Sequence, residues 1–179
     1  GDEPQDLHYD GGESYTIIGR DCIIREYVTV HRGHKTGNRT VIGDACMLMA
    51  NAHVGHDCCL GNNVIVANAT LLAGHVQVQD RAFISGACVV HQFCRIGTLA
   101  MIGGTSGIGQ DVPPYCMVTR SDLCGPNTIG LRRAGLDSRS RLAIKSAIKI
   151  LFFSGLNRQS ALERIRAEHG DVPALQPFI

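Results

Sequence analysis

Large aliphatic side chains recur at every sixth position through the middle of the chain. The series runs Ile42, Leu48, Val54, Leu60, Val66, Leu72, Val78, Ile84, Val90, Ile96, Ile102 and Ile108. A second, small-to-medium position lies four residues after each of these, as at Cys46, Ala52 and Cys58. A period of six matches neither the 3.6-residue turn of a helix nor the alternation of a simple strand. It is typical of a parallel β-helix, with three hexapeptides and about eighteen residues in each triangular coil.

The same spacing reaches back to Ile18, Ile24 and Val30, with a polar interruption at Thr36. Residues 31–41 are polar and contain glycines, so they are expected to form a loop that leaves the coil. Prolines within residues 111–126 end the strands. We therefore predict an all-β solenoid over residues 1–118, followed by a linker and a C-terminal α-helical appendage over residues 119–179.

Two helices are predicted within the appendage. Asp137 or Ser138 would cap the first, whose apolar face holds Leu142, Ile144, Ala147, Ile148 and Leu151. A turn near Gly155 separates it from a second helix around residues 159–168.

Composition and charge exclude several classes of protein. Seventeen basic and sixteen acidic residues give a net charge of +1, which offers no case for nucleic-acid binding. No run of eighteen apolar residues suggests a membrane span. The acidic, polar first residues are unlike a signal peptide, so we expect a cytoplasmic protein.

Five of the eight cysteines, namely Cys22, Cys46, Cys58, Cys88 and Cys94, fall in the small position of the repeat. A free buried cysteine packs as a small hydrophobic residue. These thiols are therefore expected to be reduced and structural, whereas Cys59, Cys116 and Cys124 lie outside that position.

The densest polar cluster within the repeat is NAHVGHDC, residues 51–58. His56, Gly74 and Gln92 are eighteen positions apart, which stacks them on one edge, with His53, His75 and His91 beside them. A histidine whose second nitrogen binds a carboxylate suits a general base, and a glycine can offer its amide to an oxyanion. Strand neighbours point to opposite faces, so the pattern leaves open whether Asp57 orients His56. Isolated histidines such as His31, His34 and His169 are expected to be solvated.

The motifs NAHVGHDC, LLAGHV, VHQFCRIG and GGTSGIGQDVPPY resemble those of the UDP-N-acetylglucosamine O-acyltransferases of lipid A biosynthesis, the LpxA family, over nearly the whole chain. The resemblance implies a bacterial left-handed parallel β-helix that forms homotrimers, with active sites between subunits. It implies transfer of an (R)-3-hydroxyacyl group from acyl carrier protein to the sugar 3-hydroxyl, the first step of lipid A biosynthesis. Neither a metal nor another cofactor is expected.

The resemblance also implies roles for individual residues. His56 would be the general base, Asp57 its acidic neighbour, and Gly74 the oxyanion-binding amide. The substrate-binding positions would be Asp6, His8, His53, His75, His91, Gln92, Asn127 and Arg133, and Gly104 would line the acyl-chain groove. His8, Ile129 and Ala134 stand where the family usually has Lys, Glu and Arg, so the acceptor could carry a 3-hydroxyl or a 3-amino group. The chain also lacks several N-terminal coils of the family and reads as a fragment or a shortened member.

Three other functions remain open at this point. A related hexapeptide acyltransferase could use a different nucleotide sugar, although VHQF and QDVPPY argue against more distant ones. A γ-class carbonic anhydrase-like enzyme could draw metal ligands from His53, His56 and His75. An inactive trimeric scaffold would keep the fold without the chemistry.

Overall fold

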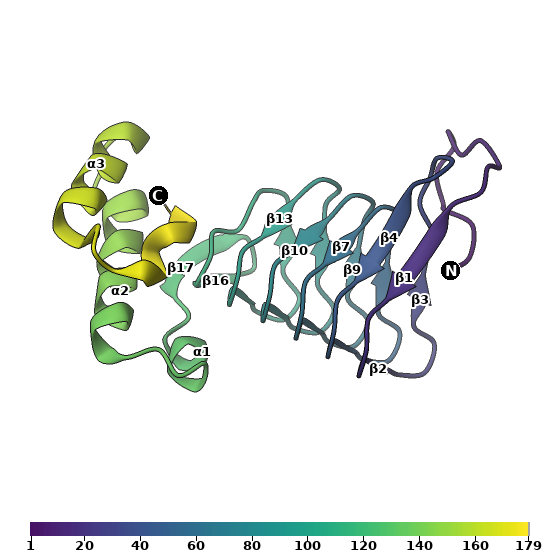
Figure 1. The fold of residues 1–179 in the computed structure, drawn as a ribbon, viewed down its shortest axis with the longest axis horizontal. Helices are drawn as coiled ribbons and strands as arrows, with labels where there is room; N and C mark the ends of the chain where they lie inside the picture. The colour runs from purple at the N-terminus through teal and green to yellow at the C-terminus, as the bar shows by residue number, and fades with distance from the viewer. Residues whose placement is uncertain (179) are drawn as a thin grey trace.

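Residues 15–119 wind into a prism of short parallel strands, with helices packed at one end (Figure 1). The structure is a computed structural model that describes residues 1–178. One sheet contains β1 (Tyr15–Ile18), β4 (Arg39–Ile42), β7 (Cys59–Leu60), β10 (Gln77–Val78) and β13 (Arg95–Ile96). A second contains β2 (Ile23–Ile24), β5 (Met47–Leu48), β8 (Ile65–Val66), β11 (Phe83–Ile84) and β14 (Met101–Ile102). The third contains β3 (Thr29–Val30), β6 (His53–Val54), β9 (Leu71–Leu72), β12 (Val89–Val90) and β15 (Gly107–Ile108).

The pairing register confirms the predicted repeat. Val41 pairs with Cys59 in the next coil, and Gln77 pairs with Arg95, so partners are eighteen residues apart. The first pairing differs, because Tyr15 pairs with Arg39, twenty-four residues further on. The extra six residues form the loop that follows β3. Since β4 begins at Arg39, this loop is shorter than the expected excursion over residues 31–41.

A non-glycine residue in the left-handed region occupies the corner after nearly every strand. These residues are Asp21, Tyr27, Ala45, Asn51, Asp57, Asn63, Ala69, His75, Arg81, Ala87, Phe93, Leu99 and Thr105, with φ between 53° and 66°. The conformation costs about 1–2 kcal/mol for an ordinary residue. A hydrogen bond to the neighbouring coil offsets this cost, as where the Asn63 amide donates to the Asp44 carbonyl at 2.8 Å. The corners are thus built without glycine at the left-handed position.

The repeated aliphatic positions fill the interior. From Ile42 to Ile102 they are almost completely buried, and Cys46, Cys58, Cys88 and Cys94 lie among them as predicted. Cys116 is also buried, although it lies outside the repeated slot. The first coil is an exception, because Ile18 and Ile24 are 43% and 44% exposed at the N-terminal end of the prism.

The C-terminal part closes the other end of the prism. β16 (Cys116–Thr119) extends the second sheet, and β17 (Asp122–Pro126) pairs with it in antiparallel fashion. The helices are α1 (Thr128–Arg133), α2 (Ser138–Phe153) and α3 (Arg158–His169), followed by the 3₁₀ helix η1 (Pro173–Phe178). None of the helices within residues 1–178 has the length and apolar character needed to cross a membrane.

Asp137 caps α2, as predicted, and its carboxylate accepts from the Ser140 amide at 2.8 Å. The predicted apolar face of this helix is partly wrong. Ile144, Ala147 and Ile148 are buried, but Leu142 is 67% exposed.

Candidate active site

His56 and Asp57 project together from the corner that follows β6. Asp57 has a φ of 58°, so the chain turns there instead of continuing as a strand. The Nδ1 atom of His56 lies 2.8 Å from Oδ2 of Asp57. The alternation rule that left this contact open in the sequence applies to strands, and these two residues belong to a corner.

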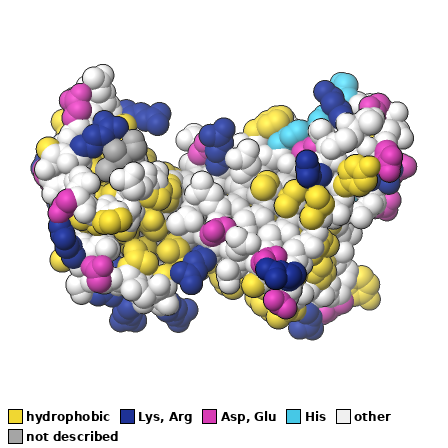
Figure 2. Space-filling view, in the orientation of Figure 1, with side chains coloured by type: hydrophobic (Ala, Val, Ile, Leu, Met, Phe, Trp, Pro, Cys, Tyr) yellow, Lys and Arg dark blue, Asp and Glu magenta, His cyan; other side chains and the backbone are white. Residues whose placement is uncertain are grey.

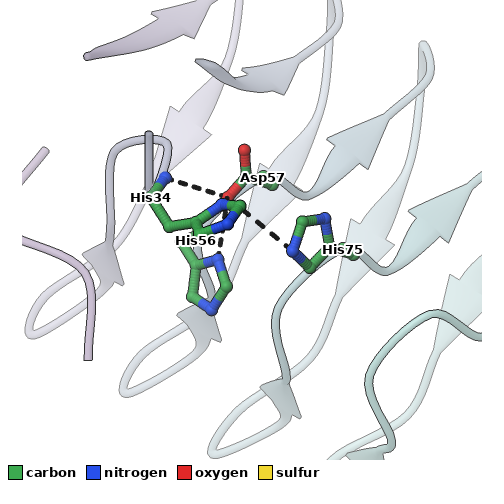
Figure 3. A group of neighbouring side chains, drawn as sticks. All are labelled: His34, His56, Asp57 and His75. Carbon is green, nitrogen blue, oxygen red and sulfur yellow. Dashed lines mark hydrogen bonds and ion pairs between the residues drawn. The ribbon is translucent and has the colours of Figure 1, made fainter. Parts of the chain in front are cut away.

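The loop after β3 fixes the Asp57 carboxylate from its other side (Figure 3). His34 approaches Oδ2 with both its backbone amide at 2.9 Å and its Nδ1 atom at 2.7 Å, and Asn38 donates to Oδ1 at 2.8 Å. The expectation that His34 is solvated is therefore wrong, because its side chain is only 13% exposed. Burial raises the pKa of Asp57, but hydrogen bonds from two imidazoles, the His34 backbone amide and the Asn38 side-chain amide lower it by more, so its pKa lies below that of an ordinary aspartate.

The carboxylate determines which nitrogen of His56 is free. An ionised carboxylate can only accept, so Nδ1 of His56 carries the proton that is donated to Asp57. Nε2 then keeps its lone pair, which is the requirement for a general base. This nitrogen lies 3.7 Å from Oδ2 of Asp6 and directly against Gly74, where an added Cβ would collide with the imidazole. Only glycine fits at position 74 without moving the base.

The Gly74 amide is available to a ligand. The amides on either side of it are engaged, since Ala73 donates to the Val90 carbonyl at 3.0 Å and His75 donates to the His56 carbonyl at 2.9 Å. Among residues 1–178, no acceptor is recorded for the Gly74 amide itself. A buried donor without a partner is uncommon and is suited to binding an oxyanion.

Two further predicted histidines flank His56. His75 stacks on Phe93 with ring centroids 4.7 Å apart, and its Nε2 atom lies 4.0 Å from Oδ2 of Asp57. The Nδ1 atom of His53 lies 2.8 Å from the Thr29 hydroxyl. Burial lowers the pKa of both His53 and His75, which favours the neutral form of each ring.

A hollow of about 440 Å³ lies beside the base. His53, His56, Gly74 and Gln92 line it, so the structure brings these four predicted residues together. Gln5 and His31 also contribute to the wall, together with apolar side chains of β9 and β12. His31 is buried instead of solvated, which corrects the prediction. Figure 2 shows exposed histidine atoms, in cyan, along this edge of the coils near the N-terminal end.

Three of the other predicted residues lie at the edge of this region. Asp6 is near Nε2 of His56, and a hydrogen bond from the His8 amide lowers the pKa of its carboxyl. The His8 side chain is 89% exposed and contacts Asp6 at 3.2 Å. His91 is exposed beside Gln92, with Nδ1 3.2 Å from the Gln92 carbonyl oxygen.

The remaining predicted residues lie outside the hollow. Gly104 is on the corner after β14, and Arg133 is exposed in the last turn of α1. Asn127 caps α1, where its Oδ1 accepts from Gly130 and its Nδ2 donates to the Leu99 carbonyl. Within one subunit, these three residues are not joined to His56.

His31 and His34 were missed, although the sequence contains a signal for them. The motif His-x-Gly-His occurs twice, as HRGH at residues 31–34 and as HVGH at residues 53–56. The structure places the copies one coil apart, with ring centroids 4.7 Å apart for His31 and His53 and 5.3 Å apart for His34 and His56.

Comparison with known proteins connects this geometry to a family. The family model described as UDP-N-acetylglucosamine O-acyltransferase, domain 2, matches residues 111–179, and the bacterial transferase hexapeptide model matches residues 39–74. An acyl-[acyl-carrier-protein]–UDP-N-acetylglucosamine O-acyltransferase from Anaeromyxobacter dehalogenans is 41% identical over 98% of this chain and 70% of its own length. The chain belongs to the UDP-N-acetylglucosamine O-acyltransferase family.

Other members of the UDP-N-acetylglucosamine O-acyltransferase family agree in sequence and in fold. The relative from Synechocystis is 46% identical over the whole of this chain, which spans 66% of that protein. The structure of LpxA from Acinetobacter baumannii matches with a TM-score of 0.93 and 37% identity, covering all of this chain and 71% of that one. The Arabidopsis acyltransferase structure matches with a TM-score of 0.93 and 40% identity over 99% of this chain and 65% of its own. The chain thus spans about two thirds of the proteins it matches.

Proposed function

We propose that this chain transfers an (R)-3-hydroxyacyl group from acyl carrier protein to the 3-position of UDP-N-acetylglucosamine, as the first step of lipid A biosynthesis. The observation that carries the proposal is the position of Nε2 of His56, which has its lone pair free and lies directly against Gly74, whose amide has no recorded acceptor. A hydroxyl that attacks a thioester needs a base and an oxyanion donor at one point. Family membership supplies the two substrates.

The reaction follows from these groups. Nε2 of His56 accepts the proton of the sugar hydroxyl as its oxygen bonds to the thioester carbon. Negative charge develops on the thioester oxygen, where the Gly74 amide donates a hydrogen bond. The C–S bond then breaks, and His56 returns the proton to the departing thiolate. Asp57 stabilises the imidazolium that exists between the two proton transfers.

The substrates need a longer cleft than one subunit offers. In our proposal, His53, His75, His91 and Gln92 contact them near the base, and Asp6 and His8 contact the sugar. Asn127 and Arg133, which lie apart from His56 within one subunit, would bind the nucleotide. The Asn127 side chain already caps α1. No cofactor takes part. We place the reaction in the bacterial cytoplasm, where both substrates are made.

A homotrimer is the assembly we propose. The outer face of the second sheet carries an apolar stripe, with Met47, Ile65, Phe83, Met101 and Met117 at successive coils. The equivalent face of the first sheet carries Gln77 and Arg95. A long apolar stripe favours burial against another copy, and cyclic symmetry repeats the contact three times. A neighbouring subunit could then bring Gly104 to the cleft. A light-scattering mass near that of a single chain would contradict this arrangement.

The test uses purified protein, hydroxyacyl carrier proteins of several chain lengths and UDP-N-acetylglucosamine, with products read by mass spectrometry. We expect one acyl group on the sugar and free carrier thiol in equal amounts. A parallel reaction with the 3-amino sugar nucleotide distinguishes the two acceptors. Absence of product from both acceptors, with every donor and with a correctly assembled trimer, would favour the scaffold alternative.

A further inference from the structure

Three imidazoles surround the Asp57 carboxylate at nearly equal spacing (Figure 3). The ring centroids of His34, His56 and His75 are 5.3, 5.1 and 5.1 Å apart in pairs. One nitrogen of each ring and one Asp57 oxygen all lie within 4.8 Å of one another. The rings come from three different segments, since His34 is in the loop after β3 while the others occupy corners of successive coils.

This spacing matches tetrahedral metal coordination. Zinc binds imidazole nitrogen at about 2.0–2.1 Å, so three imidazoles on one tetrahedral ion have ring centroids about 5.2 Å apart. The ligand atoms themselves would be about 3.4 Å apart. Nδ1 of His34 and Nδ1 of His56 are now 2.7 and 2.8 Å from Oδ2 of Asp57, and Nε2 of His75 is 4.0 Å from it. Shifts of about 1 Å or less would complete the tetrahedron.

We propose that His34, His56, Asp57 and His75 form a site for a Zn²⁺-type cation, and that the bound cation switches off acyl transfer. The second part of this inference rests on the proposed function, whereas the first does not. These residues differ from the carbonic anhydrase-like set considered from the sequence, because His53 bonds Thr29 and lies outside the cluster.

The inhibition follows from the tautomer of His56. Without metal, Nδ1 carries the proton and Nε2 is free to act as a base. A metal bound at Nδ1 occupies that lone pair, so the proton of the neutral ring resides on Nε2 instead. The proton moves from one nitrogen to the other and none is consumed. A ring protonated at Nε2 cannot accept the proton of the sugar hydroxyl.

Metal and substrate would approach His56 from different sides. The hollow is lined by His53, His31, Gly74 and Gln92, whereas His34 and His75 are absent from its wall. A metal at Nδ1 therefore leaves the hollow itself open. Because the metal would also engage His75, which contacts substrate in the proposed function, inhibition should lower kcat by a larger factor than it raises the KM for the nucleotide sugar.

The test is a titration of this 179-residue chain with Zn²⁺ by calorimetry, and with Co²⁺ by absorption spectroscopy. The exposed thiols of Cys59 and Cys124 could also bind these ions, so Cys59→Ser and Cys124→Ser provide the background. We expect one ion per subunit and the intense visible absorption of tetrahedral Co²⁺. His34→Ala should weaken binding at least tenfold, whereas the matched control His169→Ala, on α3, should leave it unchanged.

His34→Gln guards against a folding effect, because its amide can still donate to Asp57 but is a poor zinc ligand. We expect it to weaken binding as His34→Ala does. Unaltered Zn²⁺ affinity in both variants, or a weak octahedral Co²⁺ spectrum, would overturn the proposed site. In the activity arm, Zn²⁺ should inhibit acyl transfer, chelator should restore it, and the His34 variants should resist Zn²⁺ relative to their own untreated rates.

The two proposals fail in distinguishable ways. A chain that binds zinc through His34 but transfers no acyl group would refute the proposed function and keep the metal site. An active chain that binds no zinc would refute the metal site and keep the function.

Discussion

Two corners of the prism have the same backbone and opposite chemistry. Two residues after each buried aliphatic, the corner after the β4–β7–β10 strands carries Asp44, Asn62 and Asp80. There each side chain caps the coil before it, since Asn62 accepts from the Asp44 amide at 2.8 Å and Asp80 accepts from the Asn62 amide at 2.7 Å. The polar side chains of this corner therefore form hydrogen bonds that connect successive coils.

The same slots after β6, β9 and β12 contain His56, Gly74 and Gln92. The Asp80 side chain accepts a hydrogen bond from the Asn62 amide, whereas the Gln92 side chain accepts none from the Gly74 amide. The His56 ring turns instead toward Asp57, which in the other corner is matched by Ala45. The repeat thus fixes the backbone of each corner but not its side chains. Where no side chain accepts from the corner amide, as at Gly74, that amide remains available to bind a ligand.

The largest expected effect is at His56. Because this side chain supplies the base, His56→Ala should reduce kcat/KM by about 10² to 10⁴. Light scattering should show an unchanged trimer. If a tenth or more of the activity remained, the base would have to be another residue, with His53 and His75 as the first to examine.

Converting the catalytic corner into the capping corner should be nearly as damaging. Position 92 is equivalent to position 80 of the capping corner. In Gln92→Asp, the shorter carboxylate should therefore accept a hydrogen bond from the Gly74 amide, as Asp80 accepts one from Asn62. Loss of an oxyanion donor lowers kcat by about 10² to 10³. Gln92→Asn is the uncharged comparison, since it has the capping geometry of Asn62. Full activity in the Asp variant would mean that the Gly74 amide is not the donor.

Gly74→Ala tests the close approach of base and amide. The added Cβ would collide with the His56 ring, and a displacement of about 1 Å costs about 10²-fold in rate. Gly109→Ala is the matched control, because a Cβ there would meet no atom within 4 Å. Equal rates for the two variants would show that the tight fit at position 74 has no catalytic importance.

Asn62→Ala should affect stability and leave the chemistry alone. It removes the acceptor for the Asp44 amide at an exposed position, where water replaces part of the bond. We expect a loss of about 0.5–1.5 kcal/mol in unfolding free energy, measured by denaturant titration. A large fall in kcat would show that the two corners are coupled.

The smallest effect is expected at the third corner, which follows β14. Gly104 has no side chain to fill the groove of a neighbouring subunit, so the chain should prefer longer hydroxyacyl donors. Gly104→Met should shift that preference to shorter donors, since each excluded methylene forfeits about 0.8 kcal/mol of burial. Competition between donors of different lengths measures the shift. An unchanged profile in an active Gly104→Met trimer would contradict the assignment.

The period of six was sufficient to predict the core, because an inward side chain recurs at the same phase in every hexapeptide. The same period predicted that His56 and Gly74, eighteen residues apart, lie on one edge of the prism. The position of His34 could not be predicted in this way, because the loop after β3 lies outside the repeat and the period of six does not say where its side chains point. The contact of Asp57 with His56 depends on a left-handed φ at a non-glycine residue, which the side chain alone does not reveal. Ile18 and Ile24 follow the period of six but are exposed, because burial also requires contact with a neighbouring coil on each side.

The stacking of coils also determines how the site can loosen. In a solenoid each repeat contacts only its neighbours. The free energy of unfolding is therefore approximately a sum of the stabilities of single repeats and of the interfaces between adjacent repeats. His34, His56, His75 and Phe93 come from four successive coils, and the coil nearest the N-terminal end contains β1–β3, which precede the His34 loop. Opening of the coil that contains β1–β3 would release His34 and relax Asp57 while leaving Gly74 and Gln92 in place. The orientation of the base thereby depends on the stability of that coil, and the position of the oxyanion donor does not.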